Sequence, residues 1–253
     1  MDKIKDAILV GLPGSLGKRL YFYKNGTKVI HSEILDNVFI DMEIREKDAL
    51  WTKRLSTKRG HEVAVCEWFE AHLKVDDVFF DIGSCYGVFS ALVARLQPSV
   101  PVHAFEPDFL HAYFLEENAK HNKGQHEWMV NSEYVGKLDD AKNTTIDSYC
   151  KKHNAYPTVM KMDIDGGEYN ALIGMKDLIA RKKTHFLIEV HPIILRANNI
   201  TIQQILDFFD DSHVIKVLPE IRDKVESWSD DLSLIGKDKN PYIYVAPKEM
   251  ALI

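Results

Sequence analysis

The feature that most constrains the fold is the alternation of short apolar runs with helix-period stretches from residue 61 onward. Five apolar runs are typical of strands: 78–82, 102–105, 128–130, 159–162 and 186–190. Five stretches with helical periodicity follow them: 88–96, 109–120, 145–152, 168–180 and 202–209. This alternation predicts βαβ units, and hence a mostly parallel α/β sheet with helices on both faces. Two later runs, at 214–218 and 242–245, bring the predicted sheet to seven strands, with a charged insertion at 219–239 between them.

The first 60 residues are antiparallel in character. Strand-like runs at 19–24 and 28–31 flank Asn25-Gly26, and a further apolar stretch covers 38–44. Asn-Gly is the strongest short hairpin signal, because a type I′ turn needs two residues with positive φ. We therefore predict a β-rich N-terminal extension, residues 1–60, before a main domain of residues 61–253.

Composition and charge exclude several classes of protein. The chain has 253 residues and a net charge of -6, which disfavours general binding to a nucleic-acid backbone. Cys66, Cys85 and Cys150 lack the spacing of a zinc site or the even number of a disulfide framework, so a reducing cytoplasm is expected. The apolar run at 7–10 is far shorter than the ~20 residues of a spanning helix. The sequence therefore predicts a soluble protein without a membrane span.

A glycine turn follows the first strand of the main domain. Gly83 and Gly87 stand four residues apart after Asp81, where a small ligand can approach the backbone. A dinucleotide fingerprint starting at Gly83 would need glycine where Cys85 and Val88 stand, so that interpretation fails. The spacing D-x-G-x-x-x-G is instead typical of S-adenosylmethionine sites, since the ammonium group of that cofactor favours a nearby carboxylate. An earlier glycine cluster, at 11–18, departs from the phosphate-loop motif and indicates a flexible connection.

Glu106 completes the predicted pocket. It ends the second strand of the main domain, 25 residues after Asp81, where an acid in nucleotide-binding folds accepts both ribose hydroxyls. Each element has a plain structural alternative, because the glycines could only shape a turn and Glu106 could be a solvated acid. Their combination favours a cofactor pocket within residues 78–107.

Three candidate catalytic side chains stand at the ends of later strands. Asp163 ends the fourth strand, and Glu189 and His191 end the fifth, where alternation places that pair on one face. His191 suits a general base, since the reference pKa of histidine is ~6.5, although a packed strand-end histidine is an equally simple interpretation. No spacing rule selects a metal, so none is predicted and Mg²⁺ stays an alternative.

Two neighbouring motifs have structural interpretations. Asp165 as N-cap with Glu168 three residues later would form a capping box, which we favour for Asp165 and leave open against function for Glu168. The basic stretch 53–59 is either a solvated face or a lid for an anionic acceptor, with Lys58 and Arg59 as its predicted contacts.

With these residues in view, the chain resembles the FkbM family of S-adenosylmethionine-dependent methyltransferases over roughly residues 61–192. Blocks similar to the family's motifs are Asp81 to Gly87, Ala104 to Pro107, Asn118 with Asn122, Thr145 to Asp147, Lys161 to Glu168 and Ile188 to His191. Glu62 stands where the family commonly places an upstream acid. Two departures are Cys85, in place of asparagine, and Asp165, in place of glutamate.

The resemblance implies a Rossmann-like class I fold and a cofactor site. The implied cofactor-binding residues are Glu62, Asp81, Gly83, Ser84, Cys85, Tyr86, Gly87, Glu106, Pro107 and Asp163. The implied reaction moves a methyl group to a hydroxyl of a sugar or other natural product. Alternatives are methylation of nitrogen or carboxylate and a cofactor-binding module without catalysis. The acceptor and the oligomeric state, monomer or homodimer, stay open.

Overall fold

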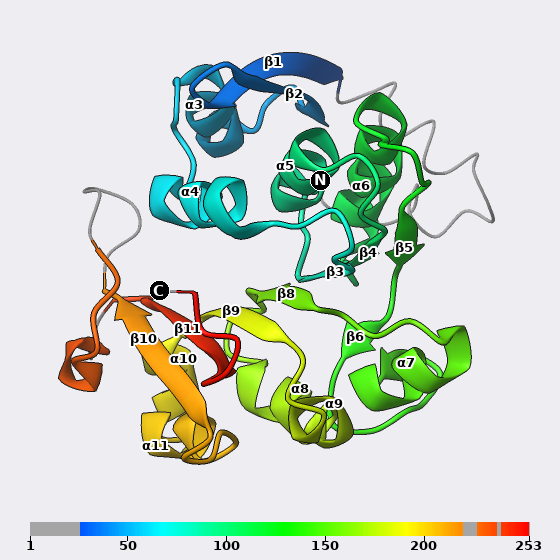
Figure 1. Ribbon diagram of the computed structural model, residues 1–253. Helices are drawn as coiled ribbons and strands as arrows, with labels where there is room; N and C mark the ends of the chain where they lie inside the picture. Colours follow the sequence, from blue (N-terminus) through cyan, green and yellow to red (C-terminus); the bar gives the residue numbers. More distant parts are fainter. Residues whose placement is uncertain (1–25, 220–226, 237–238, 253) are drawn as a thin grey trace.

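The computed structural model describes residues 26–219, 227–236 and 239–252, and a seven-stranded sheet forms its centre (Figure 1). The strands of this sheet are β3 (Phe79–Ile82), β4 (Val102–Phe105), β5 (Met129–Asn131), β8 (Val159–Met162), β9 (His185–Glu189), β10 (His213–Leu218) and β11 (Tyr242–Pro247). Their order is β10-β11-β9-β8-β3-β4-β5. The strands from β5 to β9 pair in parallel, and β11 is antiparallel to both of its neighbours. The predicted seven-stranded, mostly parallel sheet is confirmed.

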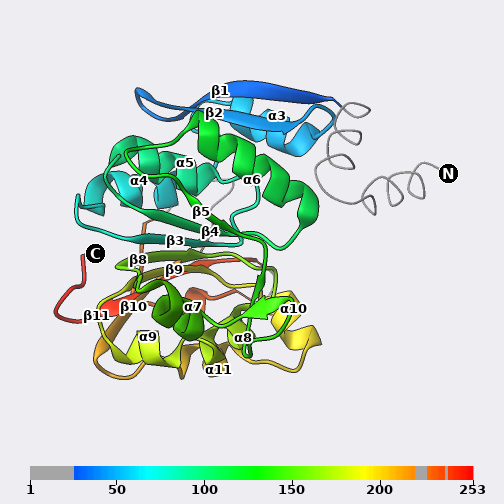
Figure 2. The same cartoon turned by 90° about the vertical axis from the view of Figure 1, so that its right-hand side faces the viewer.

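Helices cover both faces of the sheet (Figure 2). One face carries α4 (Val63–His72), α5 (Val88–Leu96) and α6 (Phe109–His121). The other face carries α7 (Ile146–His153), α8 (Glu168–Ile173), α9 (Lys176–Ala180) and α11 (Ile202–Leu206), and α10 (Pro192–Ala197) follows β9. The helix predicted at 168–180 is divided at Gly174, where a Cβ would lie 2.0 Å from the carbonyl oxygen of Gly136. Glycine is a poor helix former, so the chain turns at this close approach.

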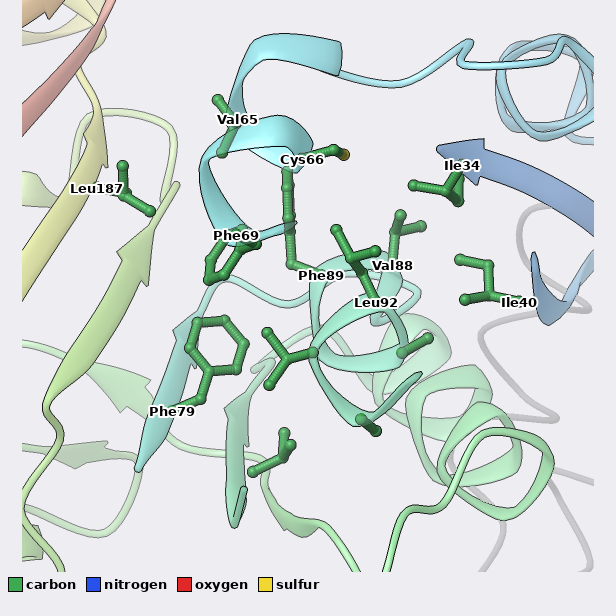
Figure 3. Close-up of a cluster of buried hydrophobic side chains, with 14 of the residues drawn as sticks. Ile34, Ile40, Val65, Cys66, Phe69, Phe79, Val88, Phe89, Leu92 and Leu187 are labelled. Atoms are coloured by element: carbon green, nitrogen blue, oxygen red, sulfur yellow. The ribbon is translucent and has the colours of Figure 1, made fainter. Parts of the chain in front are cut away.

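Each face of the sheet has its own apolar core. The core under α4 and α5 joins aromatic side chains of three elements, with the rings of Phe69 and Phe79 5.3 Å apart and those of Phe69 and Phe89 5.7 Å apart (Figure 3). Ile34 and Ile40, from outside the sheet, are fully buried in the same cluster. The second core lies under α7 to α11.

The described N-terminal strands form a hairpin. β1 (Thr27–Leu35) pairs antiparallel with β2 (Val38–Arg45), with its turn at Asp36-Asn37. The predicted turn at Asn25-Gly26 is not tested, because Asn25 and the strand before it lie outside the described residues. Asn37 supplies the positive φ, at 65°. This register places the buried side chains of both strands on the face that packs on α5, and burial fixes the register of a strand pair. The predicted strand at 19–24 lies outside the described residues.

Two asparagines attach this hairpin to the domain. The side-chain amide of Asn118 on α6 bonds both the N–H and the carbonyl of Glu43, and Asn122 does the same with Asp41. Asn118 also donates to the carbonyl oxygen of Tyr86, at 2.8 Å. The helix side chains thus replace a neighbouring strand along the edge of β2.

Several elements were not predicted from the sequence. They are α3 (Ala49–Ser56), α4, α10, the short pair β6 (Tyr134–Val135) and β7 (Asn143–Thr144), and the 3-10 helix η1 (Leu232–Leu234). Part of the predicted insertion, at 220–226 and 237–238, and the glycine cluster at 11–18 lie outside the described residues. Within the part of the chain that the structure describes, no helix combines the length and apolar character needed to cross a bilayer.

Candidate active site

The candidate site lies at the carboxyl end of β3, where the order of the strands in the sheet reverses. The chain passes from β3 to β4 and β5 on one side and returns to β8 and β9 on the other. Ligands of open α/β sheets bind at such a switch point. Gly83, with φ +77°, turns the chain there, and a Cβ would lie 1.8 Å from the carbonyl oxygen of Asp163. Only glycine fits between the ends of β3 and β8.

Hydrogen bonds fix the rest of the glycine turn against β4. The hydroxyl of Ser84 donates to the carbonyl of Asp81 at 2.7 Å and accepts from the N–H of Phe105 at 3.1 Å. Gly87, with φ +83°, precedes α5, and a Cβ would lie 2.6 Å from Leu115 Cδ1. Tyr86 is buried, and its hydroxyl donates to Asp48 at 3.1 Å. The burial of Tyr86 and its hydrogen bond to Asp48 therefore hold the glycine turn in place.

Glu106 is held by the backbone on both of its carboxylate oxygens. The N–H of Cys85 donates to Oε2 and the N–H of Asp108 to Oε1, each at 2.8 Å. Burial raises the pKa of Glu106, and these two bonds act against that rise. Pro107 follows, half-buried. Burial also raises the pKa of the Cys85 thiol, so the residue that replaces the family's asparagine presents a neutral thiol.

Two acidic side chains approach the turn, one from β3 and one from the N-cap of α4. Asp81 is buried, and its Oδ2 accepts from Ser90 Oγ at 2.7 Å, while Oδ1 has no hydrogen-bond partner among the described residues. Burial raises the pKa of Asp81. Glu62 is also buried, in the left-handed region with φ 41°, and accepts from the hydroxyl of Tyr242 at 3.0 Å. A buried non-glycine residue in this region is backbone strain of the kind found at functional sites.

Lys161 balances these acids from the neighbouring strand β8. Its side chain is buried, with Nζ 3.4 Å from Asp163 Oδ2 and 5.2 Å from the centre of the Phe89 ring. Burial acts to lower the pKa of Lys161, but the charges of Asp163, Asp81 and Glu62 raise it above the ordinary value. The block Lys161 to Glu168 was identified in the sequence as similar to a family motif, but no role was predicted for the side chain of Lys161.

The three predicted catalytic side chains meet in one cluster. One ligand atom from each of Asp163, Glu189 and His191 lies within 4.8 Å of the others. His191 Nδ1 lies 2.6 Å from Glu168 Oε1, and Nε2 lies 3.6 Å from Asp163 and 3.8 Å from Glu189. Burial acts to lower the pKa of His191, but the bond to Glu168 and the surrounding charges raise it. Burial and the charge of Asp163 raise the pKa of Glu189 to about 8.

The capping box predicted at Asp165 is wrong. Asp165 has φ 47° and an exposed side chain, and the N-cap of α8 is Gly167, which has no side-chain cap. The side chain of Glu168 does bond the backbone that precedes α8, because its Oε1 accepts from the N–H of Gly166 at 3.0 Å. Its main partner is nevertheless His191, so the second residue of the motif belongs to the site.

The same cluster has the donor set of a divalent-metal site. Two carboxylates and an imidazole suit several divalent cations, and a histidine ligand usually donates its other N–H to a carboxylate, as His191 can to Glu168. Protonation of His191 and binding of a cation are therefore two ways to balance the charge of Asp163, and the charge of Glu189 when that carboxyl is ionised.

A small cavity of about 60 Å³ lies directly over the glycine turn. One part of its wall comes from the strand ends and α5: Gly83, Ser84, Cys85, Val88, Phe89, Lys161 and Asp163. The rest comes from the segment before β3: Trp51, Arg54, His61 and Glu62. Next to it is a hollow of about 420 Å³ that shares Arg54, His61 and Glu62. A further hollow, of about 470 Å³, lies between α8, α9 and α11, away from the strand ends. Trp51 and His61 were missed because they carry no motif, and Arg54 was considered only as part of the basic stretch 53–59.

The predicted contacts of a basic lid, Lys58 and Arg59, already have acidic partners. Lys58 Nζ lies 3.0 Å from both Glu33 and Asp36, and Arg59 pairs with Asp36 and Glu67. Their charges stabilise the connection between the hairpin and α4, so this part of the lid hypothesis is corrected.

Comparison with known protein families gives a match to part of the chain. Residues 106–220, which include Glu106, Asp163, Glu189 and His191, match the model of the methyltransferase FkbM domain. Over this region the chain is similar to the FkbM methyltransferases. The FkbM match starts at Glu106, so the glycine turn precedes it. No curated protein matches the chain.

Solved structures resemble this chain at low sequence identity. A putative rRNA methylase of Clostridium thermocellum has a TM-score of 0.50 and 8% identity, over 72% of this chain and 92% of that one. The FkbM methyltransferase of Methylobacillus flagellatus has a TM-score of 0.49 and 18% identity, over 68% of this chain. The present chain spans only 44% of that protein. An O-methyltransferase of Bacillus cereus in complex with SAH has a TM-score of 0.46 and 14% identity, over 73% of this chain and 79% of that one.

The site itself fits the cofactor that an FkbM fold implies. Asp81 Oδ1 and His61 Nδ1 are buried without a hydrogen-bond partner among the described residues, and such atoms are costly unless a ligand or water binds them. Gly83 and Gly87 carry no side chain, so a cofactor can approach the backbone of the glycine turn. Backbone hydrogen bonds orient the Glu106 carboxylate at the end of β4. S-adenosylmethionine offers an ammonium, a carboxylate and two ribose hydroxyls for these groups.

Proposed function

We propose that the protein transfers a methyl group from S-adenosylmethionine to a hydroxyl of a small molecule, such as a sugar or a glycosylated natural product. The family match supports methyl transfer. The observation that carries the choice of oxygen is the buried pair of Glu168 and His191, which places an imidazole nitrogen at the strand ends. An aliphatic hydroxyl, unlike a carboxylate or a neutral amine, needs a group that removes its proton as it attacks.

In this proposal the glycine turn and its acids hold the cofactor. Glu106 accepts the two ribose hydroxyls, because the backbone bonds to Cys85 and Asp108 leave further lone pairs on both oxygens. Asp81 and Glu62 face the ammonium group. The backbone of Gly83 to Gly87, with Pro107 and Asp163, completes the predicted contacts.

His191 would act as the general base. When bound, S-adenosylmethionine supplies a methyl group whose bond to sulfur breaks as the bond to the acceptor oxygen forms. The hydroxyl proton passes to Nε2 of His191, whose Nδ1 is held by Glu168. Asp163 stabilises the resulting imidazolium, and Glu189 does so when it is ionised. Alignment of the reacting groups can contribute ~7–11 kcal/mol to such reactions.

Three alternatives compete with this proposal. Methylation of a carboxylate would need no base, and methylation of nitrogen would need none where the acceptor is a neutral amine. A module without catalysis would bind the cofactor without turnover. A bound Mg²⁺ or similar cation at Asp163, Glu189 and His191 would replace the proton on His191 and polarise the acceptor oxygen. Activity that survives prolonged treatment with EDTA would exclude the metal alternative.

The cellular setting is part of the same proposal. Cys66, Cys85 and Cys150 are free thiols, which supports the reducing cytoplasm as the compartment. We infer a small-molecule acceptor and not a nucleic acid, because the chain carries a net charge of -6.

Thermal unfolding with different ligands tests the cofactor. S-adenosylmethionine or S-adenosylhomocysteine at ~100 times its Kd should stabilise the protein by about 2.7 kcal/mol, whereas NAD should leave the midpoint unchanged. A midpoint that rises with NAD and stays constant with both sulfur ligands would refute the proposal.

Two variants separate binding from catalysis. Glu106→Gln should weaken S-adenosylhomocysteine binding by ~10-fold or more, since one ribose acceptor is lost. His191→Ala should keep that binding and lower kcat by ~100-fold or more, the usual contribution of a general base. If His191→Ala abolishes binding as well, His191 is a structural residue.

A further inference from the structure

The cavity over the glycine turn is closed by residues of the N-terminal segment. Trp51 and Arg54 come from α3, and His61 precedes α4. The described part of the predicted extension also packs into the core of the domain through Ile34 and Ile40 (Figure 3). The segment before residue 61 thus supplies one wall of the candidate cofactor site.

Arg54 differs from Lys58 and Arg59 in having no acidic partner among the described residues. Lys58 and Arg59 each pair with two carboxylates, whereas no carboxylate of the described residues lies within ion-pair distance of Arg54. Its guanidinium lies over the indole of Trp51, 5.1 Å from the ring centre. Stacking fixes the plane of a guanidinium and leaves its five N–H donors available. Those donors fit a carboxylate in bidentate geometry.

His61 provides a second unsatisfied group in the same wall. Its side chain is 5% exposed, and Nδ1 has no hydrogen-bond partner among the described residues. The rings of Trp51 and Phe89 hold it on either side, with centres 5.2 and 5.3 Å away. Burial lowers the pKa of His61, so the neutral imidazole can donate one hydrogen bond without adding charge.

The cofactor has one group that the acids of the site cannot bind. Its amino-acid part carries an ammonium, which suits Glu62 and Asp81, and a carboxylate, which these acids repel. We propose that Arg54, stacked on Trp51 and assisted by His61, binds the carboxylate of the cofactor's amino-acid part. This inference rests on the proposed function, because it assigns a second contact within the same cofactor site.

The cavity continues into a larger space. The adjoining hollow of about 420 Å³ shares Arg54, His61 and Glu62 with the cavity over the glycine turn. Arg54 and His61 therefore lie where the two spaces meet.

Two ligands that differ only in the amino-acid part test the assignment. S-adenosylhomocysteine carries the carboxylate, and 5′-methylthioadenosine keeps the nucleoside and the thioether but lacks the amino acid. Calorimetric titration of the full chain should show that Arg54→Gln weakens S-adenosylhomocysteine by ~10- to 100-fold, the usual range for lost charged hydrogen bonds, with no change for 5′-methylthioadenosine. Arg54→Lys should restore part of the loss.

Lys53→Gln is the matched control, because Lys53 is an exposed cation of the same helix that reaches only the outer hollow. It should bind both ligands like the wild type. Equal weakening of both ligands by Arg54→Gln would assign Arg54 to the support of α3, and unchanged S-adenosylhomocysteine binding would assign it to the acceptor; either result overturns the inference. If the wild type binds neither ligand, the proposed function fails first.

Discussion

Gly83 is the residue whose replacement the structure tolerates least. It combines φ +77° with a backbone approach in which a Cβ would lie 1.8 Å from the carbonyl of Asp163 and 2.9 Å from a side-chain carbon of Ile164. The first neighbour is backbone at the end of β8, which cannot rotate away. The glycine turn and the end of β8, which carries Asp163, are therefore packed so closely that no side-chain atom fits between them.

Gly83→Ala should lower the free energy of unfolding by ~3 kcal/mol or more and weaken S-adenosylhomocysteine binding, because both the left-handed backbone and the contact become strained. Chemical denaturation and calorimetry measure the two effects. Gly136→Ala is the control, since the nearest atom to its Cβ would be 3.9 Å away. Similar stability of the two variants would contradict the argument.

At the scale of elements, the contact between α6 and the hairpin links the two parts of the chain. Asn118 is fully buried and makes three hydrogen bonds, two to Glu43 and one to the carbonyl of Tyr86. One side chain therefore joins the hairpin, α6 and the glycine turn. Asn122, one helical turn later, is only partly buried and bonds Asp41.

Asn118→Ala should cost ~2–4 kcal/mol in the free energy of unfolding, because it leaves buried N–H and carbonyl groups without partners. Asn122→Ala should cost less, since water can reach its partners. Urea unfolding of both variants makes the comparison. A smaller loss for Asn118→Ala than for Asn122→Ala would show that the hairpin is not held in this way.

At the scale of the whole molecule, the buried charges of the site make stability depend on pH. Burial and Asp163 raise the pKa of Glu189 from 4.5 to about 8, so the folded protein keeps a proton on Glu189 that the unfolded chain loses. Between pH 4.5 and about pH 8 the unfolded state binds fewer protons than the folded state, so the free energy of unfolding falls as pH rises. A shift of this size corresponds to a few kcal/mol.

Glu189→Gln should remove this dependence, because glutamine imitates the protonated acid. The variant should gain stability relative to the wild type as pH rises from 5 to 9, and the two should be similar near pH 5. Melting temperatures across this range provide the measurement. A constant difference between the two proteins would mean that Glu189 does not titrate in the folded state within this range.

Much of the fold could be predicted from sequence because its signals are local. Apolar runs of strand length, helical periodicity and the glycine turn each depend on residues close together in the chain, and the seven strands were confirmed. The hairpin of β1 and β2 shows the limit, because its turn at Asp36-Asn37 was not predicted. Burial of one face of each strand fixes the register of this pair, and that burial depends on residues far apart in the chain.

The sequence by itself determined which residues carry chemistry, and only the tertiary structure decided how they combine. Asp81, Glu106, Asp163, Glu189 and His191 were recognised from strand ends and motif spacing, and their roles remain predictions. The partnership of Glu168 with His191, and the position of Arg54 over the glycine turn, had no signal in the chain. Those contacts join residues 23 or more positions apart, and their geometry is set by the packing of helices and hairpin on the sheet.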